Sequence, residues 1–135
     1  MSFYRTAFDN GTDISGVSIA RTFMGRSEFD NVSFSGSDLS ESNLCWNDFI
    51  DVDFSATILV GADLRASDYE QCTFAGADLS GADLRHSSYE GCTFEGATLI
   101  GALLAEAQRD ELELTDEQKA QVVWQPDHGP EPAGG

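Results

Sequence analysis

The chain has 135 residues, the size of one domain. Its 24 acidic and 7 basic side chains give a formal net charge of −17, which disfavours nucleic acid and anionic membranes as direct ligands. No segment reaches the roughly 20 apolar residues of a membrane span, and residues 1–4 do not resemble a signal peptide, so we expect a cytoplasmic protein with no membrane partner.

The first predicted element, residues 1–11, stands apart from the repeat that begins at residue 12. Asp9 occupies a position at which that repeat would place a large apolar residue. We expect Phe3, Tyr4 and Phe8 to fold over the start of the repeat as an N-terminal cap, because the end of a stacked fold exposes unpaired backbone and apolar side chains.

Residues 12–105 carry a repeat of five residues. A large apolar residue stands at every fifth position from Ile14 to Leu104, nineteen times without a slip, and from residue 22 on most repeats place a small residue two positions earlier. A period of five fits neither the helix repeat of 3.6 nor the strand alternation of 2. The pattern therefore predicts a solenoid, in which each repeat buries its side chain by stacking on its neighbours.

A second period, of twenty residues, groups the large residues into four columns. Column one comprises Ile14, Phe34, Phe54, Phe74 and Phe94. Column two comprises Ile19, Leu39, Leu59, Leu79 and Leu99. Column three comprises Met24, Leu44, Leu64, Leu84 and Leu104. Column four comprises Phe29, Phe49, Tyr69 and Tyr89. Because residues twenty positions apart are of the same kind, we predict a four-sided coil in which each turn lies about 4.7–4.9 Å above the last.

The repeat units resemble the pattern A(D/N)LXX of the pentapeptide repeat family. Three units match it literally: Ala62-Asp63-Leu64, Ala77-Asp78-Leu79 and Ala82-Asp83-Leu84. The resemblance implies an all-β solenoid, a right-handed quadrilateral β-helix of about five coils. It also implies that the central residue and the one two before it point inward, while the other three positions face water.

Two residue types add to this picture. Glycine recurs two positions after the central residue, at the corner of the coil, where a positive φ is often needed. Cys72 and Cys92 take inward positions one coil apart, close enough to form a disulfide. Burial as two small apolar side chains is the simpler interpretation, and Cys45 should face outward as a free thiol.

After residue 105 the repeat gives way to a C-terminal segment, residues 106–124. Thr115 and Gln118 form the sequence pattern of a capping box, so we predict a short α-helical cap running from there to about Trp124. Leu114, Val123 and Trp124 would cover the last coil, and the family resemblance implies that such a segment can also join two chains as a homodimer. Residues 125–135 are rich in proline and glycine, which predicts a disordered tail.

The sequence offers little for catalysis. His86 falls at an outer corner and His128 in the predicted tail, and the motifs CxxC, HExxH and a phosphate-binding glycine loop are missing. Asp63 and Asp83 should stack about one strand spacing apart, as in a carboxylate pair of a glycosidase, but such ladders follow from the repeat itself. We expect a protein that is not an enzyme and needs no cofactor or metal.

The outward charges are segregated by column. Column four carries seven carboxylates and no Lys or Arg on its outward side, which we call the acidic face. The acidic face comprises Glu28, Asp30, Asp48, Asp51, Asp68, Glu70 and Glu90. Over four coils these charges span about 19 Å, against about eleven charges for duplex DNA of that length. The face therefore either imitates nucleic acid towards a basic protein groove or keeps an edge-rich rod soluble and monomeric.

Apolar residues at outward positions suggest a second contact surface. These residues are Trp46, Ile50, Ile58, Val60 and Ile100. Scattered exposed apolar side chains are normal for soluble proteins, so these positions fit either a protein contact or ordinary exposure to solvent.

The resemblance also bears on function. The stretch from Gln71 to Phe74 is similar to repeats of Qnr-type quinolone-resistance members, which bind DNA gyrase as DNA mimics, although this chain has no insertion that would project as a loop. The resemblance therefore implies a non-catalytic, acidic protein-binding rod with a type II topoisomerase as its partner. The alternative is a structural scaffold or assembly module with no topoisomerase role.

Overall fold

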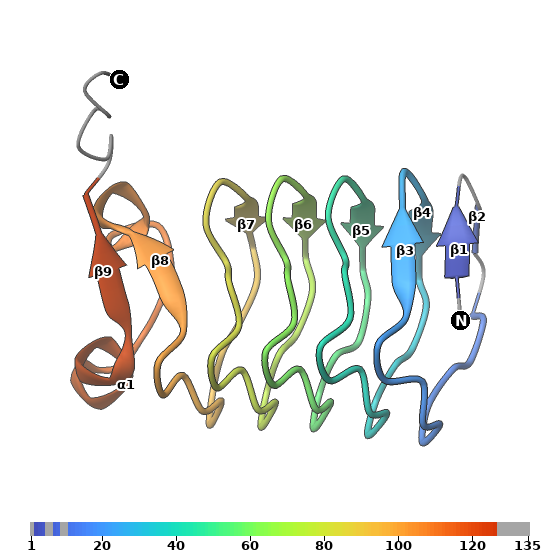
Figure 1. The fold of residues 1–135 in the computed structure, drawn as a ribbon, viewed down its shortest axis with the longest axis horizontal. Coiled ribbons are helices and arrows are strands. Elements are labelled where there is room, and N and C mark those ends of the chain that lie inside the picture. The colour runs from blue at the N-terminus through green and yellow to red at the C-terminus, as the bar shows by residue number, and fades with distance from the viewer. Residues whose placement is uncertain (1, 5–6, 9–10, 127–135) are drawn as a thin grey trace.

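The computed structural model describes residues 2–4, 7–8 and 11–126. The coils stack along the long axis of the molecule, with the N-terminal strands at one end and the helix α1 at the other (Figure 1). The predicted β-solenoid of about five coils with a C-terminal helix is confirmed.

Short parallel strands hold two sides of the coil together. The strands are β1 (Ser2–Tyr4), β2 (Ala7–Phe8), β3 (Phe23–Gly25), β4 (Glu28–Asp30), β5 (Asp48–Ile50), β6 (Asp68–Glu70), β7 (Ser88–Glu90), β8 (Leu103–Ala105) and β9 (Val123–Gln125). Column four supplies the largest sheet, in the order β2-β4-β5-β6-β7. Two pairs, β1-β3 and β8-β9, lie on column three.

Single bridges join successive coils along columns one to three. Thr73 pairs with Thr93 in column one, and Asp63 pairs with Asp83 in column three, each across twenty residues. The period of twenty in the sequence therefore corresponds to one full turn of the chain.

The core consists of the inward side chains of the repeat. From Ile19 to Leu104 every central residue is buried, and aromatic rings stack face to face within their columns. The ring centroids of Phe49 and Tyr69 lie 4.8 Å apart, and those of Phe54 and Phe74 lie 4.9 Å apart. Each such ring replaces water with a neighbouring ring on both faces, which is the main source of stability in this fold.

Polar residues at the inward small positions satisfy backbone groups inside the coil. The Ser67 hydroxyl donates to the Leu44 carbonyl at 2.7 Å and accepts the Asn47 N–H at 3.0 Å. The Asn47 side chain does the same one coil earlier, where its amide donates to the Met24 carbonyl at 2.6 Å. These residues therefore link three coils without leaving a buried polar group unpaired.

The cysteines do not form a disulfide. Cys72 and Cys92 are buried free thiols, and each Sγ lies 3.4 Å from the carbonyl of a column-four residue one coil earlier. The two cysteines thus occupy the inward position that serine occupies in other repeats, such as Ser67. Cys45 is also free and is half-buried.

The corners of the coil confirm the role expected for glycine. The residue two positions after each central residue has a positive φ in every repeat from residue 16 to residue 101, whether or not it is glycine. Ten of these residues carry a side chain, including Trp46 at 63° and Asp51 at 54°. The fold imposes this conformation, so the corner residues other than glycine carry backbone strain.

The N-terminal segment joins the solenoid rather than standing apart from it. Phe3 is in register with Met24, and Phe8 is in register with Phe29, so the pairing continues with a spacing of twenty-one residues. One additional residue between the coils explains the loss of the pattern in the sequence. Asp9, which marked that loss, lies outside the described residues.

The C-terminal helix is shorter than predicted. It is α1 (Asp116–Gln121), and Thr115 caps it with the expected capping box. The prediction that the helix runs to about Trp124 is wrong, because residues 123–125 form β9, in which Val123 pairs with Leu103 twenty residues earlier. Gln125 therefore belongs to the last strand and not to a tail, while residues 127–135 lie outside the described part of the chain.

Two buried glutamines close the last coil. Gln108 ends the 3-10 helix η1 (Glu106–Gln108), and its amide donates to the carbonyls of Leu84 and Ser87 at 2.9 and 3.2 Å. Gln118 in α1 donates in the same way to the carbonyls of Phe94 and Ala97, at 2.7 and 3.0 Å. Each glutamine satisfies carbonyls that would otherwise face a missing coil.

Candidate protein-binding face

Column four has the longest run of extended backbone among the four columns. It forms extended three-residue strands from β4 to β7, whereas columns one and two are joined by single bridges only. In each of these strands the central aromatic residue is buried and both neighbours are exposed. The strand geometry therefore presents two rows of outward side chains along this side of the rod.

Six of the seven carboxylates of the acidic face occupy these two rows. In one row Glu28, Asp48 and Asp68 are in direct register. In the other row Glu70 is in register with Glu90, and Ile50 separates them from Asp30. Consecutive rings beneath the rows are 4.8 Å apart, so equivalent carboxylates repeat at about this spacing.

All seven carboxylates of the acidic face are exposed, including Asp51 at the corner after β5. Within residues 11–126, none of the seven forms an ion pair. Their charge is therefore directed outward and is not neutralised by an ion pair within that part of the chain.

Several acidic residues of the other columns are paired instead. Arg65 donates to both carboxylate oxygens of Asp63 at 2.9 and 2.8 Å, and its Nε lies 3.5 Å from Asp83. Arg85 holds Asp83 in the same way, with its Nη2 2.7 Å from Asp83 Oδ2. Hydrogen bonding to Arg65 lowers the pKa of Asp63 below its ordinary value.

This pairing also bears on the carboxylate pair considered for catalysis. Asp63 and Asp83 do stack one coil apart, but Arg65 and Arg85 engage both of them. A general acid needs a raised pKa, and the arginine lowers that of Asp63. The geometry therefore gives these two carboxylates a structural role.

On columns one and two, acidic side chains fold back on their own turns. Asp38 accepts hydrogen bonds from the Ser40 N–H at 3.0 Å and the Ser40 hydroxyl at 2.6 Å. The hydroxyl lowers the pKa of Asp38, as does the backbone N–H. Asp53 makes the same two contacts with Ser55. These carboxylates stabilise turns, whereas none of the seven carboxylates of the acidic face makes such a contact within residues 11–126.

The outward apolar residues fall at separate places. Trp46 is 64% exposed at the corner before β5, where the Arg26 guanidinium lies 5.8 Å from its ring. Ile50 lies within the acidic face. Ile58 and Val60 flank one central residue of column two, and Ile100 stands two coils beyond Val60. Sequence reasoning missed Phe23, which is 39% exposed on β3.

The C-terminal residues divide between the core and the surface. Leu114 and Trp124 pack against the core, and Val123 is exposed on β9. The Trp124 Nε1 donates to the Lys119 carbonyl at 2.9 Å, and the Arg109 guanidinium lies 4.1 Å from the Trp124 ring. Leu114 and Trp124 thus cover the last coil within one chain.

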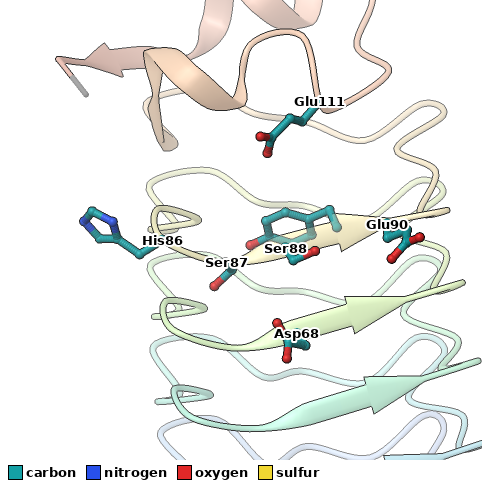
Figure 2. A pocket seen from close by; sticks show the side chains of 7 residues that line it. Asp68, His86, Ser87, Ser88, Glu90 and Glu111 are labelled. Atoms are coloured by element: carbon teal, nitrogen blue, oxygen red, sulfur yellow. The ribbon is translucent and has the colours of Figure 1, made fainter. Parts of the chain in front are cut away.

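A cavity of about 610 Å³ lies at the C-terminal end of the acidic face. Asp68, Ser88 and Glu90 border it from the sheet, and Glu111 stands on its opposite side, while His86 points away (Figure 2). Sequence reasoning did not find this cavity, because it arises where the chain after β8 fails to form a further strand on column four.

Within residues 11–126, no cluster of three His, Cys, Asp or Glu side chains could hold a metal ion. In the same part of the chain, no helix is long and apolar enough to cross a membrane.

The chain matches a known family model over most of the repeat. The model describes a pentapeptide repeat region and aligns with residues 22–99. No curated protein sequence matches the chain.

Solved structures share the fold at low sequence identity. A pentapeptide repeat protein from Nostoc PCC 7120 is 23% identical with a TM-score of 0.67, and the alignment covers 82% of this chain and 99% of that one. A pentapeptide repeat protein from the Arabidopsis thaliana thylakoid lumen is 24% identical with a TM-score of 0.52, covering 81% and 69%. QnrB1, a plasmid-mediated fluoroquinolone resistance protein, is 22% identical with a TM-score of 0.50, covering 77% and 58%.

Proposed function

The chain belongs to the pentapeptide repeat family, and we propose that it is a non-catalytic, acidic protein-binding rod. Its partner is a protein with a basic groove that ordinarily holds duplex DNA, and a type II topoisomerase such as DNA gyrase is the partner to test first. The acidic face is the surface that docks.

One observation carries this proposal: the seven carboxylates of the acidic face are exposed and form no ion pair within residues 11–126, whereas Asp63 and Asp83 on column three are held by arginine. They repeat at the 4.8 Å step of the coils. Duplex DNA carries about one charge per 1.7 Å of axis, so the face approaches its charge density within about a factor of two. A basic groove would recognise either surface chiefly through this charge.

The choice of topoisomerase rests on the family. QnrB1 is a fluoroquinolone resistance protein with this fold, and the repeats of this chain resemble those of Qnr-type members. The coils here carry no projecting loop between them, because the register runs from residue 11 to 105 without an insertion. Binding would therefore depend on the rod itself.

The alternative is a scaffold or assembly module. Exposed apolar residues favour it: Trp46 is 64% exposed, Ile100 is 60% exposed, and Val123 is 46% exposed on the last strand. A contact through Trp46 or a homodimer through the C-terminal segment would use these side chains. Such contacts depend on apolar burial and should survive high salt, whereas docking through the acidic face should not.

The test compares two triple variants with the same change of charge. The first reverses Glu28, Asp48 and Glu70 to lysine on the acidic face. The matched control reverses three exposed carboxylates elsewhere, namely Glu41, Glu95 and Glu117. All six positions lie outside the lining of the C-terminal cavity described above. Circular dichroism should show that each variant remains folded.

The readout is inhibition of DNA gyrase supercoiling at low and high salt. We expect the wild type and the control to inhibit at low salt, and the acidic-face variant to lose inhibition. Raising the salt should abolish inhibition by the wild type and by the control. Absence of inhibition by the wild type, or equal inhibition by both variants, would contradict the proposal.

A further inference from the structure

The largest sheet ends at an unpaired edge. β7 pairs with β6 on one side and is the last strand of the order β2-β4-β5-β6-β7. The residues twenty positions after β7, 108–110, complete η1 and the turn that follows instead of forming a strand. The chain then crosses over the core, where Leu112 is buried, and leaves a space beside β7.

Two cavities mark the place of the missing strand. One of about 610 Å³ and one of about 410 Å³ both border Tyr89 and Glu111. Figure 2 shows Glu111 across this space from β7, with no strand between them. The step between coils is 4.8 Å, so an extended segment beside β7 would take the position that each earlier strand of this column gives to its successor.

The backbone groups on this edge can be assigned from the pattern of the ladder. The Ser88 N–H donates to the Ser67 carbonyl at 3.2 Å, and the Glu90 carbonyl accepts the Gln71 N–H at 2.9 Å. Because bonding sides alternate along a parallel strand, the Tyr89 N–H points away from β6. Gly91 holds the place of Gln71 one coil later, so its N–H points to the same side. In the described part of the chain neither donor makes the hydrogen bond of its equivalent in β6.

The lining of this edge is acidic. Asp68, Glu90 and Glu111 border the larger cavity, and Asp110, Glu111 and Glu113 border the smaller one.

Two basic residues of the described chain lie at or next to this lining, namely His86 and Arg109. His86 points away from the larger cavity in Figure 2. Arg109 is engaged by Glu106 at 3.0 Å and by the Trp124 ring.

We propose that β7 accepts an extended, basic segment of a partner protein, which adds to the sheet as its next strand. The Tyr89 and Gly91 N–H groups would donate to carbonyls of that segment, and its lysine or arginine side chains would face Glu90 and Glu111. Addition of a strand to an open edge provides backbone hydrogen bonds, and side chains at alternate positions provide the selectivity. This site goes beyond the proposed docking of the acidic face and does not depend on the partner being a topoisomerase.

The test uses the full chain labelled with ¹⁵N and a capped heptapeptide of alternating lysine and valine, added at low ionic strength. We expect hydrogen exchange of the Tyr89 and Gly91 amides to slow by about tenfold or more at saturation. The same peptide with N-methyl groups on the alternate amides that would face β7 keeps its charge but loses the backbone donors on that edge, and it should not protect these amides. Glu111→Lys should weaken binding by about tenfold, and the matched surface variant Glu41→Lys should not.

Three outcomes would overturn the proposal. The first is equal affinity for the N-methylated peptide with shifts along Glu28 and Asp48, which would indicate plain electrostatic adsorption. The second is protection of Tyr89 and Gly91 that grows with chain concentration without peptide, which would assign the edge to a second copy. The third is no binding. None of them affects the gyrase test, whose variants leave this edge unchanged.

Discussion

Tyr69→Phe should stabilise the fold, because the Tyr69 hydroxyl is buried without a hydrogen-bond partner in the described structure. Its ring stacks between those of Phe49 and Tyr89 at 4.8 Å on each side, and phenylalanine already occupies this column at Phe29 and Phe49. The exchange therefore keeps the stack and removes only the oxygen. Burial also raises the pKa of Tyr69 well above its ordinary value, so the group stays neutral at any working pH.

The expected gain follows from the cost of burying an unpaired polar group. That cost is about 1–3 kcal/mol, and the small void left by the oxygen offsets part of it. We expect the free energy of unfolding of Tyr69→Phe to rise by about 1 kcal/mol, as measured by equilibrium urea denaturation.

Tyr89→Phe is the matched control. The Tyr89 hydroxyl donates to the Leu84 carbonyl at 3.3 Å, so its removal should leave stability unchanged or lower it by up to about 1 kcal/mol. A loss of stability for Tyr69→Phe equal to that of the control would contradict the reasoning, because it would mean that the Tyr69 hydroxyl has a partner after all.

Three further predictions concern the corners, the ion pairs and the C-terminal closure. Gly76→Ala should cost about 1 kcal/mol in urea denaturation, because φ is 69° there while the added Cβ would meet nothing closer than 4.0 Å; an unchanged stability would show that the corner carries no strain. The Arg65 guanidinium lowers the pKa of Asp63, so its stabilising effect should be complete above about pH 4 and should vanish as the pH falls through the folded pKa. The difference in stability between the wild type and Asp63→Asn should therefore shrink on acidification, and a constant difference would argue against this pairing. Gln118→Ala should cost about 2–3 kcal/mol and speed hydrogen exchange in the last coil, because it frees the Phe94 and Ala97 carbonyls; exchange as slow as in the wild type would refute this role.

The sequence was sufficient to predict the coil because a strict period leaves a single way to stack. Phe54 and Phe74 lie twenty residues apart and face one another at 4.9 Å, as the columns required. The same argument placed all seven carboxylates of the acidic face on exposed positions. The side-chain pattern of a solenoid predicts well which residues are buried and which are exposed, because each residue has the same surroundings as its equivalent in the neighbouring coil.

The ends of the solenoid could not be predicted in the same way. At the N-terminus one additional residue shifts the register, so that Phe8 pairs with Phe29, and periodicity alone cannot detect such a slip. At the C-terminus the pattern predicted a helix for residues that return to the sheet as β9. Val123 lies twenty residues after Leu103, and this spacing was the signal for the strand.

The closing glutamines were a second signal that was available. Gln118 was recognised as part of a helix cap, but its donation to the Phe94 carbonyl depends on the position of the helix in space. Gln108 stands three residues after Ala105, just as Gln118 stands three after Thr115, and it has the equivalent role. The edge of β7 is unpaired because η1 and the turn after it replace a strand, and no local sequence pattern indicates this replacement.

Competition with DNA tests the central claim most directly. Fluorescence anisotropy of a labelled duplex bound to DNA gyrase should fall as the chain is added at low salt, and adding more duplex should reverse the displacement. The variant with Glu28, Asp48 and Glu70 changed to lysine should fail to displace the duplex, while the control with Glu41, Glu95 and Glu117 changed should succeed. Binding of the chain to gyrase that leaves the duplex in place, or displacement by both variants, would contradict docking through the acidic face.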